Sequence, residues 1–595
     1  MRNIHKRYID ETYDAEGHLV KFQANPTPDF NFAYDIVDDI GVNEPGRPAL
    51  TWANPEGEEH FFSFGDIKRW SDKCANFLEA QGIGKGDKVL VILRRHYQFW
   101  IVIPALMKLG AIAVPATFML KEHDMLYRIN SAECKAIICS STGDTAQVCD
   151  NIEAQCPTLE TKMLVNGAGG GKLSREEAAS LGYGPALSGE GGVCRATAER
   201  DGWIDFNAGV LAAPEGFERR ETTWDEPFLM YFSSGTSGEP KMIMHDHSLP
   251  LAHCFTAKWW QSVCSDDGLH FTIADTGWAK TAWGKIFGQW VMEAAVFTYD
   301  FDRFHADEIL DLIPRYHITT LCCPPTMYRM MRQTDFDAHD LSCLTYCATA
   351  GEALNPDLFQ FWKEHTGHTI HEGFGQTETS VIVGNWVGGP EPKPGSMGKP
   401  SQQFTVEIQR DDGSRCDTGE TGEICIKLTP DLHGILKEYY KNPEEQAKSR
   451  RRGWYHTGDT AWVDEDGYFF YVGRNDDVIK SSGYRIGPFE IESVLLAHEA
   501  VRECAVTGVP DPVRGYAVKA TVVLSKGFEG TDDLTKELQT WVKHKTAPYK
   551  YPRVIDYVDE LPKTTSGKIR RVAIRIADEE KAHLPVENDK IDGLT

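Results

Sequence analysis

Residues 231–241 read Tyr-Phe-Ser-Ser-Gly-Thr-Ser-Gly-Glu-Pro-Lys and overlap the end of the apolar run 227–232. That run predicts a buried strand that feeds a loop. The loop carries four hydroxyl side chains and two glycines before Lys241, and glycine lets a backbone bend tightly against a ligand. Backbone N–H groups, hydroxyls and one ammonium suit phosphate oxygens. A Ser- and Gly-rich surface loop is the alternative, since the order differs from G-x-x-x-x-G-K-[ST].

Composition narrows the possible classes of protein. At 595 residues the chain exceeds the size at which one core stops growing, so two or more domains are expected. A formal net charge of −26 argues against binding nucleic acid or anionic membranes. The longest apolar run, near 99–107, is too short to span a bilayer. Acidic residues soon follow the N-terminus without an apolar segment, which predicts no signal or transit peptide. Scattered cysteines predict reduced thiols, and we expect a cytoplasmic protein.

Helical and strand-like segments alternate over 46–160 and again over 250–400, which predicts an α/β fold with doubly wound, mostly parallel sheets. Residues 402–428 alternate apolar and polar around a turn, which favours antiparallel strands and a small barrel. Residues 1–45 are expected to lie as an arm on the first domain, and the Gly-rich stretch 166–222 is expected to be a flexible excursion. The specific predictions are strands at 88–93, 111–114 and 135–139 and a helix at 96–109.

The composition changes to charge and glycine at 474–487. Beyond it the pattern predicts a compact unit of typical domain size. We therefore expect one domain over 1–473 and a second over 474–595. The predicted elements of the second are a helix at 489–497, strands at 502–509 and 516–525, and a helix at 532–545.

Two glycine-containing segments, 350–354 and 372–379, each follow a strand-like run. Parallel strands deliver such loops to the carboxyl edge of a sheet, where ligands bind. Glu378 offers a hard oxygen to Mg²⁺, which needs only one or two protein carboxylates when phosphate oxygens also bind it. A glycine-rich turn with exposed polar groups is the alternative.

The remaining motifs lie at 455–459, 473–477, 481–488 and 561–568. An Asp can accept hydrogen bonds from ribose hydroxyls, and an Arg can hold ribose or phosphate. A lysine that follows a flexible turn can meet charge that develops in a transition state. Read alone, each motif also fits a solvated turn or a basic tail.

Seven motifs, in their order along the chain, resemble those of the adenylate-forming superfamily. They lie at 231–241, 274–278, 350–354, 372–379, 455–459, 474–487 and 561–568. Members of this superfamily include acyl-CoA synthetases, peptide-synthetase adenylation domains and luciferases. The segment 546–553 looks most like the medium-chain acyl-CoA synthetases. The resemblance implies a large N-terminal domain of two mixed sheets plus a small β-barrel, and a small mobile α+β C-terminal domain that turns about Asp476.

The resemblance also implies roles for individual residues. Lys568, Lys241 and Glu378 match catalytic positions, and Thr236 and Glu378 match positions associated with magnesium. Trp278, Trp283 and Gly375 match the acyl pocket. Positions that match coenzyme A contacts are Ser482, Gly483, Tyr484, Arg514, Lys543, Tyr551, Pro552 and Arg553. Positions that match ATP or AMP contacts are Ser233, Ser234, Gly235, Thr236, Ser237, Gly238, Glu239, Pro240, Lys241, Gly351, Glu352, Ala353, Glu372, Gly373, Phe374, Gly375, Gln376, Thr377, Asp459, Arg474, Arg485 and Lys568.

One position departs from the acetate-specific branch of the family. That branch has a tryptophan that closes the acyl pocket where this chain has Gly375. Glycine is expected to open the pocket, so we predict an acid larger than acetate, either medium-chain, branched or aryl.

The implied function is an ATP-dependent acyl-CoA synthetase that forms acyl-AMP and pyrophosphate and then transfers the acyl group to coenzyme A. The expected ligands are a carboxylic acid, ATP, Mg²⁺ and coenzyme A, in a monomer or homodimer. Two alternatives stay open at this point. One is an adenylating enzyme that loads a carrier-protein thiol, and the other is a nucleotide-binding regulator without catalysis.

Overall fold

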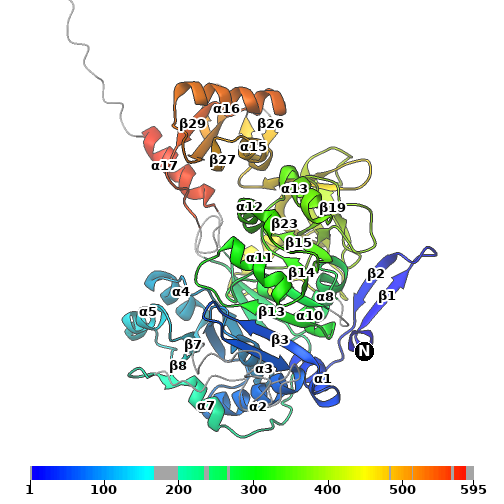
Figure 1. Cartoon of the computed structure of the whole chain (residues 1–595), viewed down its shortest axis with the longest axis vertical. Helices are drawn as coiled ribbons and strands as arrows, with labels where there is room; N and C mark the ends of the chain where they lie inside the picture. The colour runs from blue at the N-terminus through cyan, green and yellow to red at the C-terminus, as the bar shows by residue number, and fades with distance from the viewer. Residues whose placement is uncertain are drawn as a thin grey trace, which may run out of the picture.

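The computed structural model describes residues 3–166, 199–233, 240–263, 268–481, 484–511, 514–563 and 569–583. Its largest part contains two sheets with helices around and between them, and a separate lobe holds the C-terminal residues (Figure 1). This arrangement confirms the predicted α/β class with mixed sheets flanked by helices.

The first sheet has eight strands in the order β21-β11-β10-β6-β5-β7-β8-β9. Its middle strands pair in parallel, and their near-continuous apolar sequences suit a sheet that is covered on both faces. The strands predicted at 88–93, 111–114, 135–139 and 227–232 are confirmed, with small shifts at their ends. The strands are β5 (Lys88–Ile92), β6 (Ile112–Pro115), β7 (Cys134–Ser140), β8 (Thr161–Val165), β9 (Ile204–Asp205), β10 (Pro227–Phe232), β11 (Met242–Asp246) and β21 (Glu438–Tyr439).

The helices that cover this sheet begin and end where local chemistry predicts. Ser63 and Asp66 form a capping box at the start of α2 (Phe64–Ala80). Helix α3 (Phe99–Leu109) is buried along its whole length and ends at Gly110, whose φ of 68° suits a left-handed C-cap. The helix predicted at 96–109 therefore begins three residues later than expected. The others are α4 (Glu122–Ala132), α5 (Thr145–Ile152), the 3₁₀ turn η3 (Glu153–Gln155) and α7 (Phe206–Ala212).

The second sheet has nine strands in the order β18-β17-β16-β15-β14-β12-β13-β3-β4. Its outer core lies beneath α11 (Ala306–Arg315), α12 (Pro325–Arg332) and α13 (Pro356–Thr366). The sequence did not reveal that β3 pairs in parallel with β13, whose register partners lie 246 residues later. The strands are β3 (Pro48–Ala53), β4 (Glu59–Ser63), β12 (Leu269–Thr272), β13 (Ala295–Tyr299), β14 (Ile318–Cys322), β15 (Tyr346–Ala350), β16 (Ile370–Phe374), β17 (Val383–Gly384) and β18 (Lys399–Pro400).

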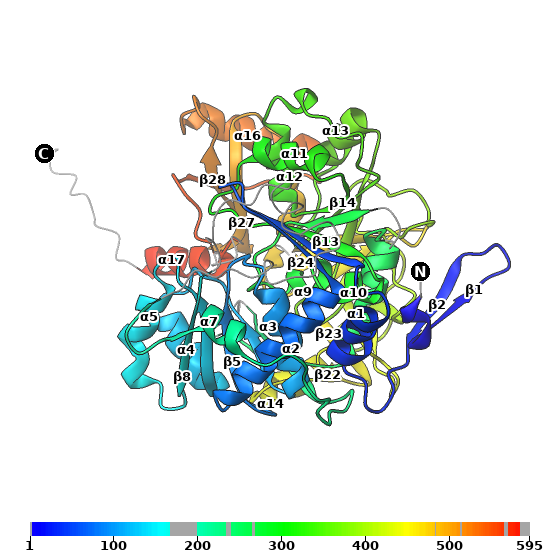
Figure 2. The same cartoon turned by 60° about the horizontal axis from the view of Figure 1, so that its bottom comes forward.

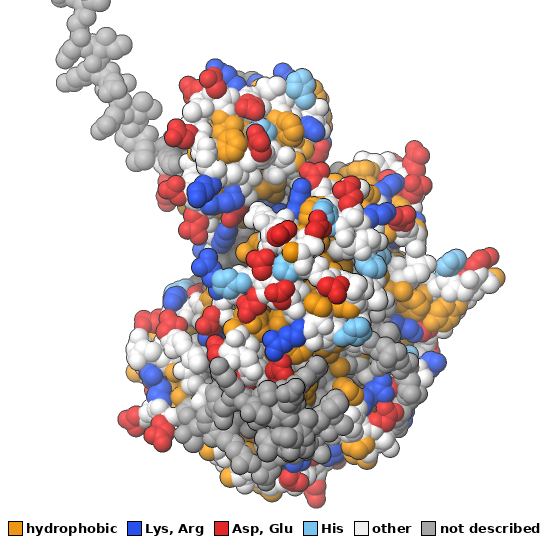
Figure 3. Space-filling model, viewed as in Figure 1, with side chains coloured by type: hydrophobic (Ala, Val, Ile, Leu, Met, Phe, Trp, Pro, Cys, Tyr) orange, Lys and Arg blue, Asp and Glu red, His pale blue; other side chains and the backbone are white. Residues whose placement is uncertain are grey.

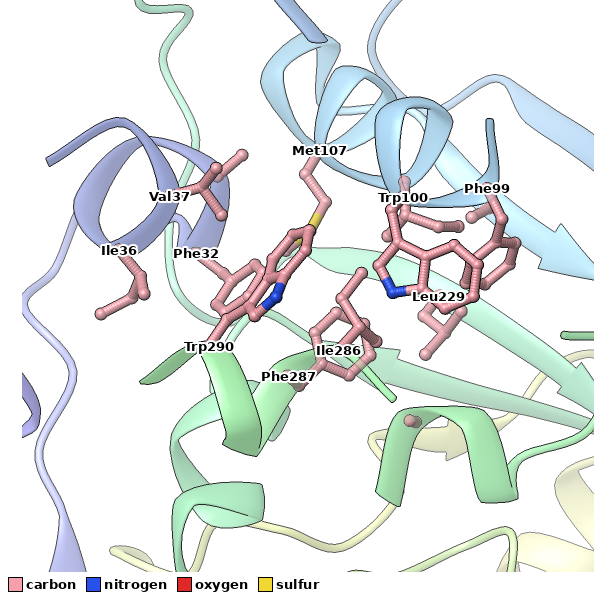
Figure 4. Close-up of a cluster of buried hydrophobic side chains, with 14 of the residues drawn as sticks. Phe32, Ile36, Val37, Phe99, Trp100, Met107, Leu229, Ile286, Phe287 and Trp290 are labelled. Atoms are coloured by element: carbon pink, nitrogen blue, oxygen red, sulfur yellow. The ribbon is translucent and has the colours of Figure 1, made fainter. Parts of the chain in front are cut away.

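A large aromatic core joins the two sheets. Trp290 stacks on Phe32 with ring centroids 6.3 Å apart, and Phe287 meets Phe32 edge-on at 5.3 Å. Figure 4 shows these rings between α3 and the short helices of the second half, with Trp100 and Leu229 beside them. Burial of such rings dominates the energetics of a core. The elements between the sheets include α8 (Leu249–Phe255), the π-helical turn η5 (Thr256–Trp260), α9 (Lys280–Gly284) and α10 (Phe287–Val291).

The N-terminal segment is more structured than an arm. Strands β1 (Ile9–Tyr13) and β2 (Leu19–Ala24) form a hairpin that extends beyond the body in both Figure 1 and Figure 2. Phe22 anchors it by meeting Phe255 edge-on at 5.3 Å. The same segment contains the 3₁₀ turn η1 (Ile4–Arg7), the π-helical turn η2 (Ala33–Asp38) and α1 (Asp39–Asn43).

The antiparallel strands predicted near 402–428 are confirmed as β19 (Val406–Gln409) and β20 (Gly422–Lys427). They belong to a five-stranded sheet in the order β19-β20-β23-β22, with β24 also paired to β23. Closure of this sheet into a barrel stays a prediction. The other members are β22 (Arg450–Arg451), β23 (Trp454–Val463) and β24 (Phe469–Arg474), with α14 (Pro443–Ser449) packed beside them.

Residues from 479 onward form their own sheet, in the order β26-β25-β28-β27 with β29 paired to β28. A separate apolar cluster lies between this sheet and its helices. The four elements predicted here agree with the structure to within two residues. The elements are β25 (Ile479–Ser481), β26 (Tyr484–Ile486), α15 (Pro488–Leu496), β27 (Val501–Asp511), β28 (Gly515–Leu524), α16 (Asp532–Lys545), β29 (Val554–Tyr557) and α17 (Arg571–His583).

Candidate active site

Hairpin β10–β11 fixes both ends of the predicted phosphate loop. Phe232 pairs with Met242 as the last register pair, and the Ser233 N–H donates to the Lys241 carbonyl at 2.9 Å. The Tyr127 hydroxyl donates to the Pro240 carbonyl at 3.1 Å. Several predicted site residues lie outside the described part of the chain: Ser234, Gly235, Thr236, Ser237, Gly238, Glu239, Ser482, Gly483, Lys568 and the side chain of Arg485.

The Lys241 side chain contacts two residues that no sequence motif identified. Its ammonium forms an ion pair with Glu445 in the first turn of α14. It also lies 5.7 Å from the centre of the Tyr439 ring. Neither Glu445 nor Tyr439 belongs to a motif recognisable from the sequence, so only the fold reveals them.

Tyr439 connects Lys241 with Glu378. The Tyr439 hydroxyl donates to Glu378 Oε1 at 3.0 Å. Burial raises the pKa of Glu378, while its own backbone N–H, the Tyr439 hydroxyl and the positive charges of Lys241 and Arg474 oppose that rise. The carboxylate therefore lies within electrostatic range of both predicted phosphate-binding cations.

A second network joins the 372–379 loop to the 455–459 motif. Gln376 Nε2 donates to the Thr457 carbonyl at 2.7 Å and to the Asp459 carboxylate. The Tyr471 hydroxyl donates to the other Asp459 oxygen at 3.0 Å, and the Tyr455 hydroxyl donates to Gln376 Oε1 at 3.0 Å. The loop after β16 and the strands β23 and β24 are thus tied together around Asp459.

Arg474 faces Asp459 directly across β23 and β24. Burial alone would lower the pKa of Arg474, but the charges of Asp459 and Asp476 more than offset this and raise it, so the guanidinium is always charged. Its Nε lies 3.5 Å from Asp476 Oδ1. Asp476 itself is exposed in the turn that leads from β24 to the C-terminal sheet.

The loops after β15 and β16 lie side by side because these strands are parallel neighbours. Glu372 is buried, and the Leu354 N–H donates to its Oε2 at 3.3 Å. Desolvation raises the pKa of Glu372 to about 8. The Glu352 carboxylate instead accepts from Thr326 on α12 at 2.9 Å and pairs with Arg329 at 3.1 Å.

Gly375 and Trp283, two of the residues predicted for the acyl pocket, lie next to one another, but without the expected open space. A Cβ on Gly375 would lie 2.4 Å from the Trp283 ring and 2.6 Å from the Ser380 carbonyl. Trp283 is only 6% exposed and meets Trp260 edge-on at 5.9 Å. In this arrangement Trp283 fills the space beside Gly375, so glycine at this position does not by itself leave open space.

The loop that presents Trp278 is held by buried polar contacts. The Thr276 N–H donates to the Arg94 carbonyl at 3.1 Å, and Lys285 Nζ donates to the Ala274 carbonyl at 3.1 Å. Desolvation, with the nearby charge of Arg95, lowers the pKa of Lys285 to about 7. These contacts fix the loop between the two sheets, where Trp278 and α9 can line a site.

The predicted coenzyme A residues fall into two groups on the C-terminal lobe. Tyr484 and Arg514 lie near one another, because Ser481 pairs with both Tyr484 and Gly515. Tyr484 also stacks on Tyr549, which the sequence did not select, with ring centroids 4.1 Å apart. The second group gathers around Tyr551, whose ring lies 4.7 Å from the Arg553 guanidinium and 5.8 Å from Lys543 Nζ, with Pro552 buried beside it.

The face of the molecule shown in Figure 3 has no single-sign patch of charge covering it. Acidic and basic side chains are interspersed on the face shown in Figure 3, and the chain has a formal net charge of −26. Because the net charge is negative, we expect binding of a polyphosphate to depend on local cations, for which Lys241 and Arg474 are candidates.

Two groups of side chains bear on metal binding. Glu378 fits Mg²⁺ as a single hard carboxylate near predicted phosphate-binding residues. Elsewhere in the described residues, Glu423, Cys425 and His456 place possible ligand atoms within 4.8 Å of one another. Arg451 already contacts Glu423 Oε2 at 2.9 Å, and His456 Nδ1 hydrogen-bonds the same oxygen at 2.9 Å. We interpret this second group as a hydrogen-bonded cluster.

Comparison with known proteins now identifies the class. Residues 38–440 match the AMP-binding enzyme family, and residues 490–568 match the AMP-binding enzyme C-terminal domain. The first match covers more than half of the chain, so the protein belongs to the AMP-binding enzyme family. Within it, the chain is an acyl-CoA synthetase, an AMP-forming acid–thiol ligase that uses ATP, Mg²⁺ and coenzyme A.

The similar proteins cover nearly the whole chain. Acyl-coenzyme A synthetase ACSM4, mitochondrial, of Rattus norvegicus is 40% identical over 92% of this chain and 91% of its own length. Acyl-coenzyme A synthetase ACSM3, mitochondrial, of Mus musculus is 38% identical over 97% and 96%. The structure of the anthranilate CoA ligase AuaEII with anthranoyl-AMP has a TM-score of 0.80 at 28% identity, over 94% of this chain and 99% of that one.

These comparisons confirm the resemblance inferred from the motifs and correct one expectation. The relatives are named as mitochondrial, so the predicted cytoplasmic location is wrong. That prediction relied on early acidic residues and on reduced thiols. The described cysteines are free, but free thiols indicate only a reducing compartment and do not distinguish the cytosol from a mitochondrion. Among the described residues, no helix has the length and apolar character needed to cross a bilayer.

Proposed function

We propose that the acid activated by this synthetase is larger than acetate, either medium-chain, branched or aryl, and that the crevice residues divide its two half-reactions between them. One observation supports this division of roles most directly: the Tyr439 ring lies 5.7 Å from the Lys241 ammonium, and the Tyr439 hydroxyl donates to Glu378, so the two residues proposed to act on the phosphates and on Mg²⁺ neighbour the same side chain. The anthranilate ligase among the similar structures supports an acid larger than acetate.

In the first half-reaction the carboxylate attacks the α-phosphorus of ATP, and pyrophosphate leaves. Catalysis of such a step depends on positioning and on neutralising phosphate charge. Lys241 would meet the β- and γ-phosphates, Asp459 would accept from the ribose hydroxyls, and Arg474 would hold ribose or phosphate. Mg²⁺, when bound, would add neutralising charge, and Glu378 with Thr236 would hold it. Lys568 would approach the same triphosphate from the C-terminal domain.

In the second half-reaction the thiol of coenzyme A attacks the acyl carbon, and AMP leaves. Lys568 cannot occupy the site while the site is open to the thiol of coenzyme A. We propose that the domain of residues 474–595 turns about Asp476 between the two steps, a conformational gate of a common kind. Tyr484, Arg514 and the cluster around Tyr551 would then contact coenzyme A, with Ser482 and Gly483 beside its pantetheine.

A panel of acids tests this function. We expect AMP release that requires both an acid and coenzyme A, with acids of about C4 to C10 or aryl acids preferred over acetate. Release that requires a phosphopantetheinyl carrier protein instead of coenzyme A would establish the first alternative. Absence of acid-dependent pyrophosphate exchange with every acid would establish a non-catalytic regulator.

The names of the relatives also support a mitochondrial location for this protein. We expect a tagged full-length chain to co-purify with mitochondria on cell fractionation. Recovery in the soluble cytosolic fraction alone would contradict this.

A further inference from the structure

The Lys241 ammonium is already paired in the structure, and its partner is firmly placed. Glu445 lies in the first turn of α14, where the Asn442 side chain accepts from the Glu445 N–H at 3.0 Å. The next residue, Gln446, accepts from the Tyr439 N–H through Oε1 at 3.0 Å. Helix α14 is therefore fixed against β21, and the Glu445 carboxylate is held beside the end of the phosphate loop.

The pair is partly shielded from solvent. The side chains of Lys241 and Glu445 are 26% and 19% exposed. Charges that are partly buried are screened less by salt than charges on an open surface. A carboxylate and a phosphate are also alternative acceptors for one ammonium. Any phosphate group that uses Lys241 must therefore compete with Glu445 or share the cation with it.

We propose that Glu445 is a built-in counter-ion that competes with the β- and γ-phosphates of ATP for Lys241. The proposal rests on the proposed function, in which Lys241 contacts those phosphates. Glu445 pairs with Lys241 when no nucleotide is bound. The ion pair breaks when ATP binds and forms again when pyrophosphate leaves. Glu445 is thus a positioning residue that weakens the grip on pyrophosphate and favours its release.

The proposal predicts a selective change in ligand affinity. Glu445→Gln keeps the size of the side chain and the N–H that Asn442 caps, but it removes the negative charge. The affinity of the variant for magnesium pyrophosphate, and its KM for ATP, should both improve roughly three- to tenfold, as expected when a partly buried ion pair no longer competes. Affinity for AMP should stay within about twofold, because AMP has no β- or γ-phosphate.

The matched control is Glu444→Gln. Glu444 is exposed on the same turn of α14, so this variant makes the same change in net charge one residue away. It should leave the affinities for pyrophosphate and AMP unchanged. Equal improvement in both variants would show a general charge effect and would overturn the proposal, as would tighter binding of AMP and pyrophosphate alike by Glu445→Gln.

A double-mutant cycle separates this inference from the function on which it rests. In a Lys241→Met background, Glu445→Gln should no longer improve pyrophosphate binding, measured by calorimetry on variants whose thermal unfolding matches the parent. If Lys241→Met alone leaves binding of ATP and pyrophosphate unchanged, the proposed role of Lys241 is wrong. If Lys241→Met weakens both ligands but Glu445→Gln strengthens neither, only the counter-ion proposal is wrong.

Discussion

The buried position of Glu372 disfavours the charged form of its carboxyl group. Side chains alternate between the two faces of β16, and that of Glu372 points into the core beside Leu354, where it is 5% exposed. Among the described contacts, its carboxyl group has only one hydrogen bond from the Leu354 backbone. Desolvation consequently raises its pKa to about 8, and the group is mainly protonated at neutral pH.

That raised pKa makes stability depend on pH. In the unfolded chain Glu372 loses its proton near pH 4.3, whereas in the folded chain it keeps the proton to about pH 8. The folded state thus binds more protons in between, so this residue lowers the free energy of unfolding by up to about 1.4 kcal/mol for each pH unit that the pH rises through that window. We expect Glu372→Gln to flatten the dependence, measured by urea unfolding at pH 5 to 8. An unchanged slope would contradict the assignment.

A second prediction at this scale concerns Trp283, which we propose limits the size of the acid in the acyl pocket. Its ring fills the space beside Gly375, so Gly375→Trp cannot close the pocket without displacing it. We expect Trp283→Leu to raise kcat/KM for bulky aryl acids about tenfold relative to butyrate, because the pocket deepens by several carbon atoms. Trp462→Leu is the control, since that ring stacks on Phe470 in another sheet. Unchanged preference in Trp283→Leu would show that this ring does not limit acid size.

At the scale of elements, the placement of helix α17 matters because the helix begins three residues after Lys568. Arg571 in its first turn binds Glu492 of α15 through both carboxylate oxygens, at 2.7 and 2.8 Å. Burial would lower the pKa of Arg571, but the charge of Glu492 raises it. Lys519 on β28 meets Asp578 further along the helix. The helix is therefore fixed to the C-terminal sheet at two points.

Loss of the first point should loosen α17. Glu492→Gln leaves Arg571 with a weaker partner in a largely buried position, and we expect it to destabilise the C-terminal domain by about 1–3 kcal/mol. Hydrogen exchange of the α17 amides should rise accordingly, and adenylation should fall more than thioester formation. Glu490→Gln on the same helix removes only a surface pair with Lys550 and should cost less than about 1 kcal/mol. Equal effects of the two changes would contradict the role of the pair.

At the scale of the whole molecule, much of the fold was predictable because local patterns determine it. Apolar runs located β5, β6, β7 and β10, and Gly110 marked the end of α3. Pairing of β3 with β13 was not predictable, because contacts between segments 246 residues apart leave no local signal. The same reason hid Tyr439 and Glu445, whose importance depends only on where β21 and α14 are placed. The space beside Gly375 was misjudged because a ring from α9 occupies it.

The account as a whole requires that Lys241 and Lys568, more than 300 residues apart, act on one nucleotide in the first step only. We propose that Lys568 neutralises charge during adenylation only, because coenzyme A attacks an adenylate that is already formed. This division of labour between two arrangements of the domains is the claim on which the proposed mechanism depends.

The most direct test measures the two half-reactions separately in Lys568→Ala. We expect acid-dependent formation of acyl-AMP from ATP to fall by about 10³-fold or more, as for loss of a group that stabilises transition-state charge. Thioester formation from preformed acyl-AMP and coenzyme A should stay within a few fold of the parent enzyme. An equal loss in both half-reactions would contradict the account.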